Sequence, residues 1–258
     1  LVIFIVVATW VVMKLPQFGS IPKGERLENI LRSPNYRDGE FRNLNEKPMM
    51  IPGENSDGFF TVMKKMFFSK KNNTIPPSTL PSKKVDLLHL DPKENILVWF
   101  GHSSYFMQVD GKTILVDPVF SGHASPFFFM IKSFKGSDIY KVEDMPKIDY
   151  LFITHDHYDH MDYKTVKNLE PKVGKVITGL GVGETLSRWG YNDQKIIEKD
   201  WSENVNLSDG FNIVVTPTHH FSGRSFKRNQ TLWTSFVLST PSKKIYLGGD
   251  SGYDTHFK

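Results

Sequence analysis

The chain has 258 residues, of which 39% are hydrophobic and 13% aromatic, so it can bury a substantial core. It contains no cysteine, which excludes disulfides, thiolate metal ligands and a cysteine nucleophile. The formal net charge is +4, from 32 Lys and Arg against 28 Asp and Glu. So small an excess does not decide between a phospholipid surface and nucleic acid as an anionic partner.

An apolar stretch opens the chain over residues 1–13, and Lys14 and Pro16 end it. Crossing a bilayer takes about 20 apolar residues, so this stretch alone is short. We expect residues 1–15 to be the end of a membrane anchor or signal segment whose beginning is missing, with the protein held at the cell envelope on the periplasmic side. A cleaved signal peptide and a buried core strand are the alternatives.

Residues 16–94 are rich in Pro, Asn, Ser and Lys, which predicts an arm laid over a domain. Within this arm, residues 59–71 interleave Phe and Met with Lys at near-helical spacing, as in a basic amphipathic helix. Such a helix either packs on the main domain or contacts a lipid surface.

From residue 95 the pattern becomes that of a mixed α/β domain, which we expect to extend over 95–258. A hairpin is predicted where an Asp110-Gly111 turn joins two alternating apolar runs. A helix is predicted over 184–189. The predicted strands cover residues 96–100, 105–109, 113–116, 150–154, 175–178, 211–216, 234–238 and 244–247.

The densest polar segment directly follows the apolar strand at 150–154 and places three imidazoles and three carboxylates within residues 155–162. Burying these groups without a cation would cost several kcal/mol. His155 and His157 stand two apart in an extended turn and can converge on one metal, whereas Asp159 and His160 turn toward a neighbouring one. Two divalent ions are therefore predicted, with zinc favoured and iron or manganese also compatible with these ligands.

The string His-Asp-His-Tyr-Asp-His over residues 155–160 resembles the H-x-H-x-D-H motif of the metallo-β-lactamase superfamily. The resemblance implies a four-layer αββα sandwich. It also implies that His155 and His157 bind metal one, while Asp159 and His160 bind metal two. Asp159 would in addition be the catalytic residue, because its carboxylate can orient the attacking water and accept its proton.

Two further ligands are implied by the resemblance. On chemistry alone His219 and His220 are equal candidates for the third histidine of metal one; similarity favours His220, which precedes an aromatic residue and Ser-Gly-Arg. Asp250, after the strand at 244–247, takes the place of the carboxylate that bridges both ions. The family's last metal-two histidine lies further downstream, so we expect the domain to be incomplete at Lys258.

Three residues are expected around the ligands. By the resemblance, Asp117 would fix ligand histidines by hydrogen bonding, and His102 would line the cleft unless it is a satisfied core histidine. Asp162 either bonds the far nitrogen of a ligating imidazole or caps the helix that begins at Tyr163.

The Gly101-His102-Ser103 opening, Tyr158, the Phe-Ser-Gly-Arg segment at 221–224 and Leu232-Trp233 most resemble the N-acyl-phosphatidylethanolamine-hydrolysing phospholipase D branch and its bacterial relatives. This resemblance implies a dinuclear metal-dependent phosphodiesterase acting on membrane phospholipids, with the membrane surface as partner. The apolar run at 127–131 packs in the core or forms a lipid-facing lip.

Other functions remain open for this sequence. A lactonase or other small-ester hydrolase would use the same metals, and a non-catalytic envelope protein would keep only the fold. Nucleic acid is not an expected partner, because the lysines are scattered and few aromatics interleave them for base stacking.

Overall fold

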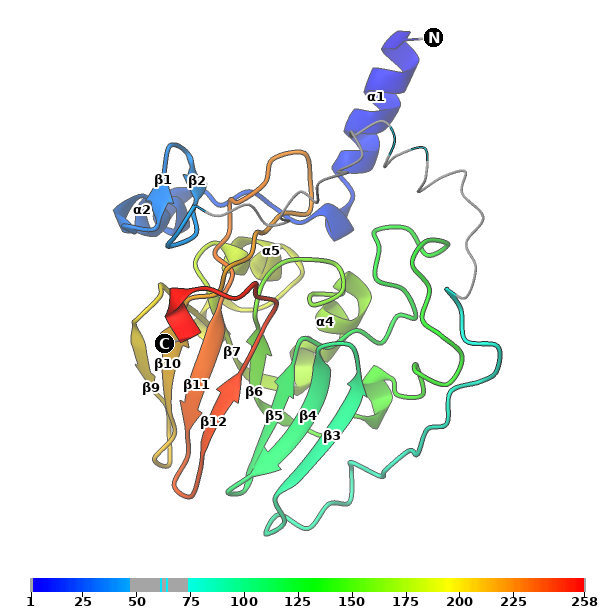
Figure 1. Cartoon of the computed structure of the whole chain (residues 1–258), viewed down its shortest axis with the longest axis vertical. Coiled ribbons are helices and arrows are strands. Elements are labelled where there is room, and N and C mark those ends of the chain that lie inside the picture. The colour runs from blue at the N-terminus through cyan, green and yellow to red at the C-terminus, as the bar shows by residue number, and fades with distance from the viewer. Residues whose placement is uncertain (1, 47–60, 62–63, 65–73, 258) are drawn as a thin grey trace.

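The computed structural model describes residues 2–46, 61, 64 and 74–257, and its centre is a pair of sheets packed face to face (Figure 1). The larger sheet has six strands in the order β3-β4-β5-β6-β7-β8. Pairing is antiparallel from β3 to β5 and parallel from β5 to β8. The strands are β3 (Ile96–Gly101), β4 (Ser104–Val109), β5 (Lys112–Val116), β6 (Ile148–Ile153), β7 (Val173–Gly179) and β8 (Ile196–Lys199).

The smaller sheet is entirely antiparallel in the order β12-β11-β10-β9. Its strands are β9 (Asn204–Asn206), β10 (Asn212–Thr216), β11 (Ser235–Ser239) and β12 (Lys244–Leu247). The predicted hairpin is confirmed: Asp110 and Gly111 join β4 to β5 with φ values of 47° and 76°. Positive φ at both central residues gives the two-residue turn whose twist matches the strands, and Asp-Gly favours it.

Side chains on the two faces of the large sheet belong to separate cores, because successive strand residues point to opposite faces. In β6, Tyr150 and Phe152 contact the small sheet through residues such as Phe236, whereas Leu151 and Ile153 belong to the core on the other face. All four are buried. The near-continuous apolar run of β6 is therefore explained by burial on both faces.

The second core is closed by two helices, α4 (Tyr163–Leu169) and α5 (Val182–Arg188), which lie on the outer face of the large sheet. Val166, Leu169 and Leu186 are their fully buried contacts. The order of layers is thus helix, sheet, sheet, which gives three of the four layers of the predicted αββα sandwich. Across the described ranges no α-helix covers the outer face of the small sheet, where Tyr246 is 49% exposed and contacts Phe257 of the short 3-10 helix η5 (Thr255–Phe257).

Several elements in and around the arm have no clear sequence signal. The predicted arm contains α2 (Gly24–Arg32) and the two-stranded β1 (Tyr36–Arg37) and β2 (Glu40–Phe41), whose Ile30 and Phe41 enter the core between the sheets. Strands β8 and β9 are short and polar, so alternation does not mark them. Arg26 of α2 pairs with Glu198 of β8 at 2.7 Å, which attaches the arm to the sheet edge.

The apolar N-terminal stretch forms α1 (Val2–Met13), a 12-residue helix that projects from the domain and has no buried residue. None of the helices in the described part of the chain has the length and apolar character needed to span a membrane. Of the predicted amphipathic helix over 59–71, only Thr61 and Lys64 are described, so that prediction lies outside the described residues.

The packing of the two sheets can be tested at one close contact, which joins Gly179 at the end of β7 to Leu232 before β11. A Cβ added at Gly179 would overlap the backbone carbonyl of Leu232, whereas one added at Gly248 would meet only the Tyr246 ring at 3.4 Å. We expect Gly179→Ala to lower the free energy of unfolding by about 1–3 kcal/mol, because the backbone must shift. Chemical denaturation of this variant beside Gly248→Ala checks it; equal unfolding midpoints would contradict the packing.

Candidate metal centre

The site is built on a buried carboxylate at the end of β5. Asp117 is fully buried and accepts hydrogen bonds from the Thr154 amide at 2.8 Å and the Thr154 hydroxyl at 2.6 Å. Its Oδ2 atom also lies 2.8 Å from Nδ1 of His160. A carboxylate only accepts, so Nδ1 of His160 carries the proton and Nε2 is left facing the site. The expectation that Asp117 orients a ligand histidine agrees with this geometry.

The same carboxylate orients a second imidazole through Thr154. The single hydroxyl proton of Thr154 is donated to Asp117, so its oxygen accepts from Nδ1 of His155 at 3.0 Å. This fixes the His155 tautomer and leaves the Nε2 lone pair free for a cation. Sequence analysis assigned no role to Thr154, because a threonine at a strand end is unremarkable until its partners are known.

Three histidines from two loops form the first cluster: His155 and His157 after β6, and His220 after β10. Nδ1 of His157 lies 2.9 Å from Nε2 of His155 and 3.2 Å from Nε2 of His220. Neutral imidazoles carry one N–H each, so three nitrogens that converge in this way cannot all be satisfied by one another. A divalent cation would accept all three lone pairs, and the cluster therefore fits the implied metal ion.

The second cluster combines His102, His160 and Asp250. Asp250 stands between the clusters, with Oδ1 3.3 Å from Nε2 of His160 and Oδ2 3.7 Å from Nε2 of His220. The His160 side chain is fully buried, and its Nε2 atom faces the carboxylates of Asp250 and Asp159, as expected for a ligand atom. The position of Asp250 between both groups is the one that a bridging carboxylate would need.

Asp159 lies beside this second cluster. Its Oδ2 atom is 3.1 Å from Nε2 of His102 and 4.0 Å from Nε2 of His160. The side chain is 40% exposed, so it can reach solvent and substrate. His102 was predicted to line the cleft or to be a satisfied core histidine; the structure leaves its side chain 55% exposed and brings its ring into the cluster, where it contacts the Asp159 carboxylate.

Protonation differs between the two clusters. Burial lowers the pKa of His155 well below its ordinary value, with the neighbouring imidazoles adding to the effect. Burial likewise lowers the pKa of His220 to about 4. For His160, burial disfavours the charged form, but hydrogen bonds to Asp117 and Asp250 outweigh it and raise the pKa to about 10. The hydrogen bond to His160 lowers the pKa of Asp250 to about 2.

Two sequence-derived alternatives are decided by these contacts. His219 points away from the clusters, with Nδ1 3.1 Å from Asp254, so the structure places His220 and not His219 with the ligands. The expectation that Asp162 bonds a ligating imidazole is wrong: its carboxylate accepts from the Ser121 amide and the Thr165 hydroxyl. Asp162 does stand at the start of α4, but its carboxylate bonds the Thr165 side chain and accepts no hydrogen bond from a backbone amide of the helix.

A buried guanidinium supports the ligand loop from behind. Arg224 is 5% exposed and donates to the carbonyls of Asp156 and Met161, which flank the ligand histidines. Its guanidinium stacks over Tyr158 at 4.1 Å, and the Tyr158 hydroxyl donates to the Arg224 carbonyl. The Ser-Gly-Arg motif marked this residue in the sequence, but the loop that it holds became apparent only in three dimensions.

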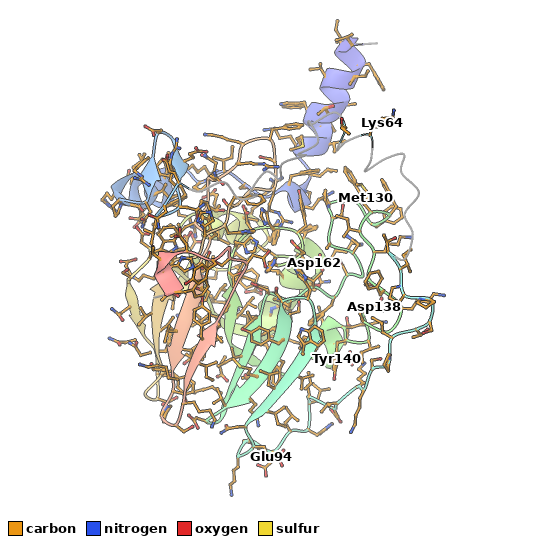
Figure 2. All side chains as sticks on the ribbon, viewed as in Figure 1. Lys64, Glu94, Met130, Asp138, Tyr140 and Asp162 are labelled. Atoms are coloured by element: carbon orange, nitrogen blue, oxygen red, sulfur yellow. The ribbon has the colours of Figure 1, made fainter. Side chains whose placement is uncertain are left out.

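A cleft of about 470 Å³ adjoins the second cluster. His102 and Asp159 form its polar end, and Trp99, Ile131 and Phe134 line its apolar wall. Trp99 and Ile131 are 67% and 66% exposed, which is unusual for such large apolar side chains. Of the two alternatives for the 127–131 run, core packing is therefore wrong for Phe128, Phe129, Met130 and Ile131, which are 43–71% exposed. Figure 2 shows Met130 near the end of the molecule from which α1 projects.

The model of the Beta-lactamase superfamily domain family matches residues 112–257, which is more than half of the chain. The chain belongs to this family. The predicted metallo-β-lactamase fold is thereby confirmed, and the metal-ligand clusters lie within the matched residues except for His102. The chain carries the fold of metal-dependent hydrolases.

Three relatives illustrate the range of this family. An uncharacterized protein of Mycobacterium tuberculosis is 33% identical over 88% of this chain and 60% of its own length. The N-acyl-phosphatidylethanolamine-hydrolyzing phospholipase D 1 of Caenorhabditis elegans is 28% identical over 70% of this chain and 54% of its own. A UPF0173 metal-dependent hydrolase of Pyrobaculum neutrophilum is 29% identical over 60% of each. The chain thus spans little more than half the length of these relatives.

The role of Asp117 can be tested by metal affinity. We expect Asp117→Asn to weaken zinc binding by about 10- to 100-fold, because the side-chain amide of the asparagine does not fix the tautomers of His155 and His160 as the carboxylate does. Asp149→Asn is the matched control, since Asp149 accepts from the amide and hydroxyl of Thr113 at the opposite end of the same strands. Competition with a chromogenic chelator measures both; equal losses in the two variants would contradict an orienting role.

The raised pKa of His160 predicts a pH dependence. Because His160 is protonated at neutral pH without metal, binding an ion there must release about one proton, whereas His220 is already neutral. Apparent zinc affinity should therefore rise about ten-fold per pH unit below the His160 pKa. Calorimetry in buffers of different ionisation enthalpy measures the released proton. His160→Gln should bind zinc more weakly without that release, and undiminished release in it would exclude His160 as the source.

Proposed function

We propose that this protein is a metal-dependent hydrolase that cleaves a phosphodiester bond in membrane phospholipids. The observation that carries the proposal is the continuity between the ligand clusters and the apolar cleft at His102 and Asp159. The similarity to a phospholipase D of Caenorhabditis elegans supports the same substrate class.

The residues present suit phosphodiester chemistry. When bound, two divalent ions at these clusters would activate water and neutralise charge on a phosphoryl oxygen. Asp159 is placed to accept a proton at Oδ2, because His102 holds that atom at 3.1 Å and the side chain remains accessible. His160, held by Asp117, keeps the Asp250 carboxylate between the clusters.

The surroundings of the cleft favour a substrate that stays in a bilayer. Removing a phospholipid completely would expose its acyl chains to water at about 0.8 kcal/mol per CH₂. Apolar side chains at the rim reduce this cost, and the exposed Trp99, Ile131 and Phe134 are available for that contact. Phe18, which follows α1, packs on Phe127 with ring centroids 6.1 Å apart, so the loop and the base of the apolar helix adjoin.

The proposal predicts that Asp250→Ala loses metal and turnover together. Removing the carboxylate that lies between the clusters should release at least one ion and lower phosphodiester hydrolysis by at least about a hundred-fold. Metal content by mass spectrometry and turnover of N-acyl-phosphatidylethanolamine in vesicles measure this. Asp209→Ala, which changes an exposed aspartate that pairs with Lys112, should keep both.

The substrate class is tested on the unaltered protein with three substrates: the vesicle phospholipid, a soluble chromogenic phosphodiester and a soluble lactone. Hydrolysis of the lactone but neither phosphodiester would replace the proposal with a lactonase or other small-ester hydrolase. A protein that holds no metal and turns over none of the three would instead be a non-catalytic member of the fold.

A further inference from the structure

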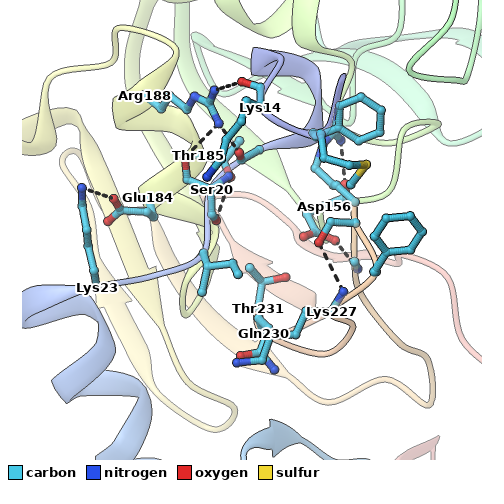
Figure 3. A pocket seen from close by; sticks show the side chains of 18 of the residues that line it. Lys14, Ser20, Lys23, Asp156, Glu184, Thr185, Arg188, Lys227, Gln230 and Thr231 are labelled. Atoms are coloured by element: carbon cyan, nitrogen blue, oxygen red, sulfur yellow. Dashed lines mark hydrogen bonds and ion pairs between the residues drawn. The ribbon is translucent and has the colours of Figure 1, made fainter. Parts of the chain in front are cut away.

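A second cavity, of about 490 Å³, lies at the base of α1 and is separate from the metal-ligand clusters (Figure 3). Its walls come mainly from three segments that are distant in the chain: residues 10–23, helix α5, and residues 223–231. Asp156 forms part of one wall and accepts a hydrogen bond from the Gly223 amide at 2.7 Å, so the cavity lies behind the ligand loop.

Hydrogen bonds between distant segments fix the shape of this cavity. Arg188 of α5 donates to the carbonyls of Lys14 and Gly19, and the Trp189 indole donates to the Pro16 carbonyl at 2.9 Å. The Ser20 amide donates to the Thr185 hydroxyl at 2.9 Å. The segment that connects α1 to the arm is therefore attached to α5, and these hydrogen bonds hold the wall of the cavity that this segment forms.

The cavity has an excess of positive charge. Lys14, Lys227 and Arg188 line it, and within the described ranges none of the three has a carboxylate at ion-pair distance. Among the described residues, the guanidinium of Arg188 bonds backbone carbonyls and the Ser20 hydroxyl and no carboxylate. Of the two acidic residues in the walls, Glu184 is already paired with Lys23 and Arg26. Unpaired cations around a concave wall favour an anion.

Large apolar side chains surround these cations. Trp10 of α1 is 63% exposed and Phe226 is 84% exposed, and both line the cavity. Beyond them, residues 2–7 of α1 are all apolar and more than half exposed. A ligand that suits both features carries a phosphate next to a long apolar body, and a membrane phospholipid has that arrangement.

We propose that this cavity binds the headgroup phosphate of an anionic phospholipid in a bilayer, with α1 and Phe226 in the apolar layer beside it. The lipid held there is not the one that is hydrolysed, because the cavity contains none of the clustered metal-ligand residues. Its effect is to hold the protein on an anionic surface with the adjoining ligand loop close to the membrane.

The test is co-sedimentation of the chain with phosphatidylcholine vesicles with and without phosphatidylglycerol. Lys14→Gln combined with Lys227→Gln should lower binding to the anionic vesicles by about 30-fold, since each lysine near such a surface contributes about five-fold. Both side chains are exposed, so folding is not at risk. Lys243→Gln with Lys244→Gln is the matched control, because these lysines lie in the β11–β12 hairpin at the opposite end of the molecule from α1 (Figure 1), and it should bind unchanged.

Further outcomes separate this inference from the proposed function. The Lys14 and Lys227 double variant should hydrolyse a soluble phosphodiester at the original rate, and Asp250→Ala should still bind anionic vesicles. Equal losses of vesicle binding in both lysine pairs would overturn the cavity as the site. Release of the chain from vesicles by glycerol phosphate would overturn the bilayer as the source of the phosphate.

Discussion

The buried carboxylate of Asp117 is the constraint on which the candidate metal centre depends. It lies at the end of β5 with no solvent contact, and within the described part of the chain its hydrogen-bond partners are donors from Thr154 and His160. Through Thr154 it sets the tautomer of His155 in one cluster, and directly it sets that of His160 in the other. One side chain thus orients an imidazole in each cluster, and the parallel pairing of β5 with β6 brings the strand ends together.

The backbone conformation of two residues at the site costs free energy of folding. Asp117 and His102 both adopt left-handed φ values, 42° and 49°, which side chains with a Cβ rarely take. Such conformations cost of the order of 1 kcal/mol each and persist where the surrounding contacts determine them. For Asp117 those contacts are the hydrogen bonds to β6 and His160. For His102 they include the Trp99 indole, which donates to the His102 carbonyl at 2.9 Å.

The sequence predicted the parts of this structure whose signals are local. Alternation located β4, β5 and β10, Asp-Gly located the hairpin turn, and the histidine-rich string marked the ligand loop. Strands β8 and β9 were not predicted, because their residues are half-buried or polar and lie at a sheet edge. His102 and Asp162 show the other limit: His102 meets Asp159 and Asp162 accepts from the Ser121 amide, and both contacts join residues 41 or more positions apart.

The buried guanidinium of Arg224 has a practical consequence for shortening this chain. Besides the ligand loop, it donates to the Gln17 carbonyl at 2.9 Å, and its Nη2 atom already lacks a hydrogen-bond partner within the described part of the chain. A truncation after Ser20, made to remove the apolar helix for expression, would leave Nε unpaired too and uncover Arg188 and Trp189. Each buried donor left unpaired costs about 1–3 kcal/mol. A shortened derivative should therefore begin no later than Lys14, so that the residues that contact Arg188, Trp189 and Arg224 are kept.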